Sequence, residues 1–339
     1  MTDTPGRAHR IDLHAHYLAP SYQEALQGAE MSLIGGIPVP EWTPELALEF
    51  MDAHGIAVQM LSVSDPGVEF VHRERAPELA RECNDFAAGL VREYPVRFGA
   101  FAVLSMSDVE QARTETVRAL DELSLDGVGM LSSYDGRYPG DPAFEPLLLE
   151  LNRRGAWVMV HPASINVERK PDLSVPGFIA EYPFDTTRAF MSLLFNGAFE
   201  THPHIRWHFA HGGGTLPMLR ARLAAASAAA KELGPFLGMP AGGTLLTADS
   251  AHRALAGSFY DTALIADPPA LQAVANVAGP GHLMFGSDWP FAARMYAPEG
   301  DPQPALAEVF SGDELLAVER AGALEQFEQL ANRLAPLQH

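Results

Sequence analysis

The sequence contains a single cysteine, Cys83, and this scarcity excludes an intrachain disulfide. It also has no uninterrupted apolar run of the roughly eighteen residues that a membrane-spanning helix needs. Residues 1–10 are polar and do not lead into the apolar segment of a secretory signal. These absences predict a cytoplasmic protein with no membrane segment, and we expect Cys83 to be packed in a helix and unreactive.

Basic residues are scarce as well, with 23 Lys and Arg against 43 Asp and Glu, which gives a formal net charge of −20. Nucleic acids and anionic membrane surfaces repel a protein this acidic, so neither is an expected partner. An anionic substrate would have to be held by local positive side chains or by a metal ion.

Eight apolar segments of strand length alternate with helix-like segments along the chain. The predicted strands are 10–16, 56–63, 97–104, 126–131, 155–161, 205–211, 258–264 and 282–288. The predicted helices, with apolar residues three and four apart, are 44–54, 76–93, 108–124, 143–154, 185–201, 215–232, 268–278 and one or two over 304–334. Strands buried on both faces read as continuous apolar runs, so this alternation predicts an α/β protein, a single (β/α)8 TIM barrel domain over 1–339.

Three connections are longer than the others. The segments 17–42 and 162–184 leave the carboxyl ends of predicted strands, where barrel enzymes build their sites, and we expect them to form walls or lids of a pocket. The segment 234–257 precedes a strand and is expected at the opposite end or at an oligomer contact. Helix starts are predicted at Thr43-Pro44 and Ser107-Asp108, where a side-chain oxygen or a proline suits the first turn.

Five titratable side chains fall at the carboxyl ends of four predicted strands: His14, His16, His161, His211 and Asp288. A His-x-His pair alone also arises by chance, but His14 and His16 share one side of a strand, because side chains alternate. In a barrel all five converge on one face. Three imidazoles and a carboxylate suit a zinc-like ion, so we interpret His14, His16, His161 and Asp288 as metal ligands and His211 as a free acid or base.

The positions of the lysines bear on the number of metal ions. The chain has only two, Lys170 and Lys231. Binuclear sites of this architecture commonly use a carboxylated lysine from the fourth strand. Neither lysine is near 126–131. The sequence therefore predicts one divalent ion, Zn²⁺ first and Mn²⁺ as the alternative.

Several motifs together resemble the amidohydrolase superfamily, in the branch that contains aminocarboxymuconate semialdehyde decarboxylase and the resorcylate and 6-methylsalicylate decarboxylases. They are the His-x-His strand, Val-His-Pro at 160–162, Phe-Ala-His-Gly-Gly-Gly at 209–214, Phe-Gly-Ser-Asp-Trp-Pro-Phe at 285–291, and the segments 50–56 and 182–188. The resemblance implies a mononuclear metal enzyme, and a homodimer, that removes carbon dioxide from an aromatic or unsaturated acid without oxygen or an organic cofactor.

The resemblance also implies residue roles. The family's metal ligands match His14, His16, His161 and Asp288, and its proton-transfer residue matches His211. Some resorcylate-type members have Glu in the opening pair, and a Glu where this chain has Gly214. The departure leaves open whether a metal-bound hydroxide or the substrate's own oxygens act at the metal.

The same ligands suit two reactions. In decarboxylation, the metal chelates the carboxylate and a neighbouring phenolic oxygen, Asp288 donates a proton to the ring carbon, and His211 relays it. In hydrolysis, metal-bound water attacks an amide or lactone carbonyl. We rank decarboxylation of a salicylate-type acid first, hydrolysis second, and a binding barrel without activity third.

Four further residues are candidates for substrate binding. Arg188 is expected to clamp a carboxylate, with an exposed ion pair as the alternative. Tyr134 is expected to line the pocket unless it packs in its loop, and Trp289 and Phe291 offer aromatic walls unless they fill the core. His208 lies three residues before His211 and is expected on the other side of the strand.

Overall fold

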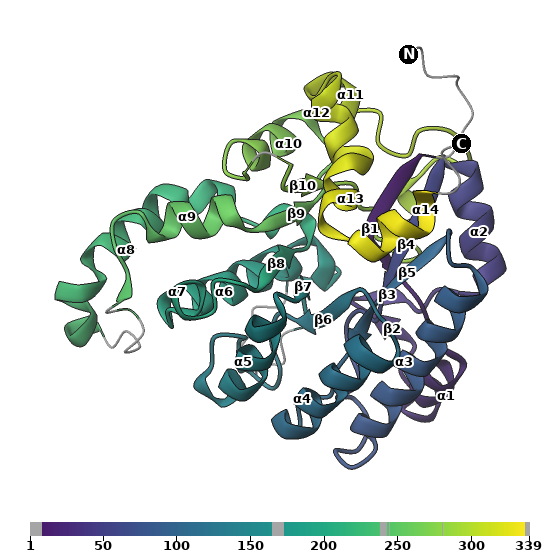
Figure 1. Cartoon of the computed structure of the whole chain (residues 1–339), viewed down its shortest axis with the longest axis horizontal. Coiled ribbons are helices and arrows are strands. Elements are labelled where there is room, and N and C mark those ends of the chain that lie inside the picture. The colour runs from purple at the N-terminus through teal and green to yellow at the C-terminus, as the bar shows by residue number, and fades with distance from the viewer. Residues whose placement is uncertain (1–8, 165–172, 238–242, 244, 280, 336–339) are drawn as a thin grey trace.

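The computed structural model describes residues 9–164, 173–237, 243, 245–279 and 281–335 (Figure 1). Its main sheet has eight parallel strands in the order in which they occur along the chain, which confirms the predicted TIM barrel. The strands are β1 (Arg10–His16), β4 (Ile56–Ser62), β5 (Phe98–Val103), β6 (Gly127–Leu131), β7 (Trp157–His161), β8 (Arg206–Phe209), β9 (Phe259–Asp261) and β10 (Leu283–Met284).

Backbone hydrogen bonds join the segment after β10 to β1 and bring the two ends of the sheet together. The Leu13 amide donates to the Phe285 carbonyl at 2.9 Å, and the Asp288 amide donates to the His14 carbonyl at 2.7 Å. The His16 amide donates to the Trp289 carbonyl at 2.8 Å. This closure places the last predicted ligand, Asp288, directly beside the first two.

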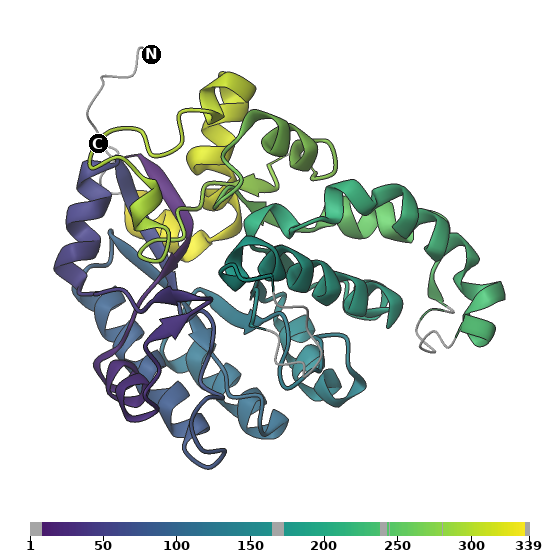
Figure 2. The same ribbon diagram turned by 180° about the vertical axis from the view of Figure 1, so that it is seen from behind.

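Helices surround the strands (Figures 1 and 2). The longer ones are α1 (Pro20–Gly28), α2 (Pro44–Ala53), α3 (Ala76–Glu93), α4 (Val109–Val117), α5 (Glu145–Arg154), α6 (Glu181–Phe195) and α8 (Leu216–Leu237). The shorter ones are α7 (Ala198–Thr201), α9 (Ser250–Gly257), α10 (Pro268–Ala275), α11 (Leu306–Val309), α12 (Asp313–Leu316), α13 (Gly322–Gln326) and α14 (Glu328–Leu334). The predicted starts are confirmed, because the side chains of Thr43 and Asp108 accept backbone hydrogen bonds at the beginnings of α2 and α4.

The interior of the barrel is closed at the amino ends of its strands. Side chains from the inner faces of the strands, such as Ile11, Phe101 and Trp157, form one buried apolar cluster with Phe327 and Leu330 from the C-terminal helices. Burying this apolar surface stabilises the barrel. The open end is therefore the carboxyl end, where the histidines lie.

Two of the three long connections pack against each other at the carboxyl end. The first contains a hairpin of β2 (Leu33–Ile34) and β3 (Ile37–Pro38). A Cβ on Gly35 would lie 2.5 Å from the Tyr182 hydroxyl oxygen, and one on Gly36 would lie 2.9 Å from the Pro176 Cα, so only glycine allows this close approach. Of the second connection, 165–172 lie outside the described residues.

The third long connection is largely helical at its two ends. α8 continues through Gly234 to Leu237, past the end at 232 that the sequence predicted, and α9 occupies 250–257. Residues 238–242 and 244 lie outside the described residues. In Figures 1 and 2 the pair formed by α8 and α9 projects away from the barrel. Its expected role at an oligomer contact stays a prediction, as does the single domain over 1–339.

Cys83 is fully buried in α3, and burial raises the pKa of its thiol to about 12, so the thiolate that would react is disfavoured. Among the helices of the described residues, none combines the length and apolar character needed to cross a membrane.

Candidate metal centre

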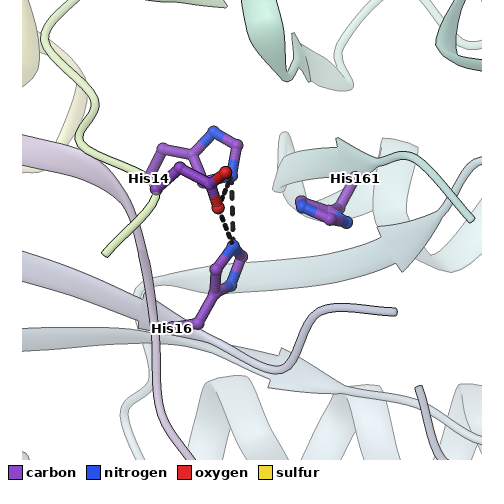
Figure 3. A group of neighbouring side chains, drawn as sticks. His14, His16 and His161 are labelled. Carbon is purple, nitrogen blue, oxygen red and sulfur yellow. Dashed lines mark hydrogen bonds and ion pairs between the residues drawn. The ribbon is translucent and has the colours of Figure 1, made fainter. Parts of the chain in front are cut away.

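Four side chains from three separate parts of the chain meet at the carboxyl end of the barrel (Figure 3). His14 and His16 come from β1, His161 ends β7, and Asp288 follows β10. One ligand atom from each lies within 4.8 Å of the others, and all four residues are buried. The His16 Nε2 is 3.2 Å from the His14 Nε2 and 3.0 Å from the Asp288 Oδ1. The four residues predicted as ligands therefore form a buried His/His/His/Asp metal site.

The ring nitrogens that face away from this centre are held by oxygen atoms. The His161 Nδ1 lies 2.8 Å from the Pro162 carbonyl oxygen, which can only accept, so this nitrogen carries the proton. The His16 Nδ1 lies 3.0 Å from the Ser62 hydroxyl oxygen and 3.3 Å from the Ser62 carbonyl oxygen. In both rings the remaining lone pair is on Nε2, which points to the centre.

Asp261 fixes the third ring in the same way. Its Oδ2 lies 2.9 Å from the His14 Nδ1 and 2.8 Å from the His208 Nε2, so both of these nitrogens carry protons. Its Oδ1 accepts the backbone N–H groups of His211 and Ala263 at 3.0 Å. Burial would raise the pKa of Asp261, but the two imidazoles hold it well below its ordinary value, so the carboxyl stays ionised.

This donor set fits a divalent cation. With protons on the Nδ1 atoms, the Nε2 lone pairs of His14 and His16 face each other at 3.2 Å, an arrangement that a cation between them stabilises. Burial lowers the pKa of His14 and, together with the charges of neighbouring histidines, lowers that of His161 well below its ordinary value. Neutral imidazoles and an ionised carboxylate are the forms that bind a metal ion.

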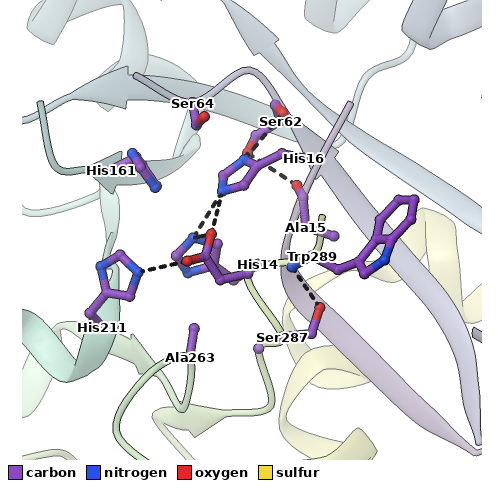
Figure 4. Close-up of polar contacts among 12 residues, drawn as sticks. His14, Ala15, His16, Ser62, Ser64, His161, His211, Ala263, Ser287 and Trp289 are labelled. Atoms are coloured by element: carbon purple, nitrogen blue, oxygen red, sulfur yellow. Dashed lines mark hydrogen bonds and ion pairs between the residues drawn. The ribbon is translucent and has the colours of Figure 1, made fainter. Parts of the chain in front are cut away.

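His211 lies beside this centre without belonging to it (Figure 4). The sheet ends at Phe209, and the left-handed backbone of His211, at φ 55°, turns its side chain inward. Its Nε2 is 3.5 Å from the Asp288 Oδ2, and neither ring nitrogen has a hydrogen-bond partner among the described residues. Burial works to lower the pKa of His211, but contact with Asp288 outweighs it and raises the pKa. The raised pKa favours a protonated imidazole.

Two opposing influences act on the pKa of Asp288. Burial would raise the pKa of Asp288, but its contacts with the imidazoles of His16, His211 and His14 hold it far below its ordinary value. Asp288 is therefore ionised, and its charge favours the protonated form of His211. This separation makes His211 the better proton donor of the two.

Sequence reasoning did not identify Asp261, and its expectation for His208 was wrong. His208 points into the barrel and contacts Asp261, because the chain turns out of the strand at Phe209 and so breaks the alternation that would have separated His208 from His211. The available signal was a carboxylate inside an otherwise apolar strand, since a buried charge needs partners.

We expect Asp261→Asn to weaken metal binding by about 10- to 100-fold, because loss of the carboxylate frees the His14 ring to turn or to change tautomer. Competition with a chromophoric chelator would measure the affinity. The control is Asp267→Asn, a change of the same kind at an exposed carboxylate. Equal metal affinity in the Asp261 and Asp267 variants would contradict the orienting role.

A cavity of about 430 Å³ opens above the metal centre. His161 and Asp288 reach it from the centre, and Ser64 and Tyr182 line it nearby. The β2–β3 hairpin forms one wall, and 290–295, which follow the barrel's last strand, form another. Of the predicted substrate contacts, Phe291 lines the cavity, and its ring lies 5.5 Å from that of His16.

The other three predicted substrate contacts are not among the residues that line this cavity. Arg188 is half-exposed and lies 3.6 Å from the Asp185 Oδ1, which is the ion pair considered as its alternative. The Tyr134 hydroxyl accepts the Leu131 amide at 2.7 Å in its own loop. Trp289 is buried, and its ring stacks on that of Phe50. A substrate contact for these three stays a prediction.

The comparisons with known proteins agree with this geometry. A family model described as amidohydrolase matches residues 11–325. The 6-methylsalicylic acid decarboxylase of Aspergillus aculeatus is 36% identical over 293 residues, which are 84% of this chain and 85% of that protein. Decarboxylase macB of Penicillium terrestre is 33% identical over 297 residues, 84% of each chain.

A solved structure shows a similar fold. It is 5-carboxyvanillate decarboxylase from Novosphingobium aromaticivorans in complex with manganese and 4-hydroxy-3-methoxy-5-nitrobenzoic acid. It is 20% identical, covers 97% of this chain and 98% of its own, and superposes with a TM-score of 0.80.

Proposed function

This chain belongs to the amidohydrolase family, and from that membership we propose that it is a metal-dependent decarboxylase of a small aromatic, salicylate-type acid. The relatives that are 33% and 36% identical are both decarboxylases. The observation that carries the proposal is the convergence of three imidazole Nε2 atoms and the Asp288 carboxylate beside an acid, His211, whose Nε2 lies 3.5 Å from the Asp288 Oδ2.

His14, His16, His161 and Asp288 are the proposed ligands of one divalent ion, zinc or manganese. Manganese is the ion in the 5-carboxyvanillate decarboxylase structure, and zinc suits three imidazoles and a carboxylate. When bound, the ion supplies an electrophilic anchor for the substrate carboxylate and a neighbouring phenolic oxygen. The single phenolic oxygen beside the carboxylate gives a salicylate two oxygen atoms placed to bind one ion, and this makes the substrate class suitable.

The residues around the centre supply the proton. Loss of carbon dioxide leaves an electron pair on the ring carbon, so protonation of that carbon first lowers the barrier. In the proposed step the N–H bond of protonated His211 breaks and a C–H bond forms. The carbon–carboxylate bond then breaks, carbon dioxide leaves, and the electron pair restores the aromatic ring. Asp288, ionised and 3.5 Å from His211, stabilises the protonated imidazole before the transfer.

The test is product analysis with metal-loaded protein and 6-methylsalicylate in D₂O. We expect equal amounts of carbon dioxide and 3-methylphenol, with deuterium on the ring carbon that carried the carboxylate. Omission of the metal should abolish the reaction. Cleavage of amides or lactones without release of carbon dioxide from any salicylate would instead support hydrolysis, the alternative reaction of the same ligand set.

We also propose that the chain forms a homodimer, as the resemblance implies. The projecting pair of α8 and α9 supports this, because it carries Met218 and Phe236 with exposed fractions of 81% and 86%.

A further inference from the structure

The cavity above the metal centre is larger than a methylated salicylate requires. Its volume of about 430 Å³ falls in the range, roughly 300–1,000 Å³, that holds drug-sized ligands. A 6-methylsalicylate is a single ring with three small substituents, two of which are the oxygen-bearing groups directed at the metal centre. Space therefore remains beyond the ring.

The polar side chains of the cavity are placed near the metal centre. Ser64 and His161 both line the cavity, and the rings of Tyr182 and His161 are 6.0 Å apart. The Tyr182 hydroxyl donates to the buried Asp65 carboxylate at 2.8 Å, so its proton is already used. Few groups are thus left to hydrogen-bond a second polar substituent of the ring.

Many of the side chains that line the cavity are apolar. Ile37 and Val39 of the hairpin segment face the cavity together with Phe178, Leu264 and Met295. The charged side chains that line the cavity apart from Asp288 are Glu41 and Arg294, and both are exposed to solvent. Moving an apolar group from water to these walls lowers the free energy. A hydroxyl placed there would instead lose its hydrogen bonds to water.

The segments that form the cavity also expose large apolar side chains. Leu33, Val175, Ile179 and Met295 have exposed fractions between 50% and 65%. The first three belong to segments that touch each other, because the Phe178 amide donates to the Gly35 carbonyl at 3.3 Å. Met295 lines the cavity itself. Exposed apolar side chains grouped at one place commonly mark a binding site for an apolar ligand.

Resting on the proposed decarboxylase function, we infer that the substrate is a salicylate-type acid with an alkyl substituent longer than methyl at ring position 6, next to the carboxylate and on its opposite side from the phenolic oxygen. The carboxylate and phenolic oxygen lie at the centre, the ring lies against Phe291, and the alkyl chain fills the apolar space between Ile37 and Met295. The polar groups of the metal centre and the apolar walls of the cavity match the two parts of this molecule.

The experiment measures binding without turnover. The ligands are 3-methyl-, 3-propyl- and 3-pentyl-2-nitrophenol, in which a nitro group replaces the carboxylate and cannot leave as carbon dioxide. Calorimetry on the manganese-loaded full chain would give each Kd. We expect Kd to fall roughly tenfold for every two methylenes added, from the usual gain per buried methylene. A Kd that is constant or rises along the series would overturn the inference.

Two variants locate the alkyl chain. Ile37→Trp fills the apolar space and should remove the advantage of pentyl over methyl. Leu149→Trp makes a similar enlargement on α5, at a residue with an exposed fraction of 55% outside the cavity, and should leave the advantage intact. A pentyl advantage that survives Ile37→Trp would overturn the placement.

Turnover of the corresponding 6-alkylsalicylates separates this inference from its premise. Release of carbon dioxide from 6-methylsalicylate with no gain for longer chains would overturn the inference and leave the proposed function standing. Chain-length-dependent binding of the nitrophenols with no carbon dioxide from any acid would contradict the proposed function, while the apolar ligand site would be supported.

Discussion

Asp288→Asn protein should lose decarboxylase activity by about 10³-fold or more, because one substitution removes three contributions at once. The carboxylate supplies the only negative charge among the four ligands, and its Oδ1 is 3.0 Å from the His16 Nε2. Its Oδ2 faces His211, whose pKa it raises. An amide of the same shape carries no charge, so it binds a cation weakly and does not favour protonated His211.

Two measurements check this expectation. Metal content after dialysis should fall below one ion per chain, and kcat/KM with 6-methylsalicylate should fall together with it. Asp313→Asn, an exposed carboxylate at the start of α12, is the matched control and should behave as the unchanged protein. Full metal content with kcat/KM within tenfold of the unchanged protein would show that Asp288 is neither a metal ligand nor needed for catalysis.

The barrel was predictable because its signals are local and repeated. Each strand is a short apolar run, and the helix over 76–93 has the same bounds in the structure as in the sequence pattern. The β2–β3 hairpin carries no such signal. It is only two residues long on each side and depends on Gly35 packing against Tyr182, a contact between segments far apart in the chain.

The end of α8 shows a second limit of local rules, because the helix is longer than they predict. Gly234 and Pro235 predict that a helix stops, yet the helix continues to Leu237. Packing of α9 along α8 is a tertiary contact that can outweigh the weak preference of a glycine. Such contacts cannot be read from residue spacing alone.

The ligand set was predictable for a geometric reason. Closed parallel strands bring their carboxyl ends to one face, so His14, His161 and Asp288 had to meet once the barrel was recognised. The predicted strand 258–264 placed Asp261 in its middle, whereas β9 ends at Asp261, so finding it required knowing where the strand ends and which residue lies under His14. Substrate contacts were the least predictable, since loop residues such as Arg188 turn toward local partners like Asp185.

His211→Ala protein should keep its metal and lose turnover by about 10²- to 10⁴-fold, the usual contribution of a positioned acid. The ring is not one of the four converging ligands, and its two nitrogens have no hydrogen-bond partner among the described residues that the change would leave unpaired. Because the proton is needed in the chemical step, kcat should carry the loss while KM stays within a few-fold.

The control for this change is His204→Ala, which removes an exposed histidine far from the centre and should leave kcat unaltered. Added imidazole should restore part of the rate in the His211 variant and none in a variant that has lost a ligand, because a small acid can enter the space beside Asp288 but cannot replace an absent metal. Normal metal content with full kcat in His211→Ala would show that the proton added to the substrate ring comes from another group. Asp288, whose Oδ2 lies 3.5 Å from the His211 Nε2, would then be the next candidate donor.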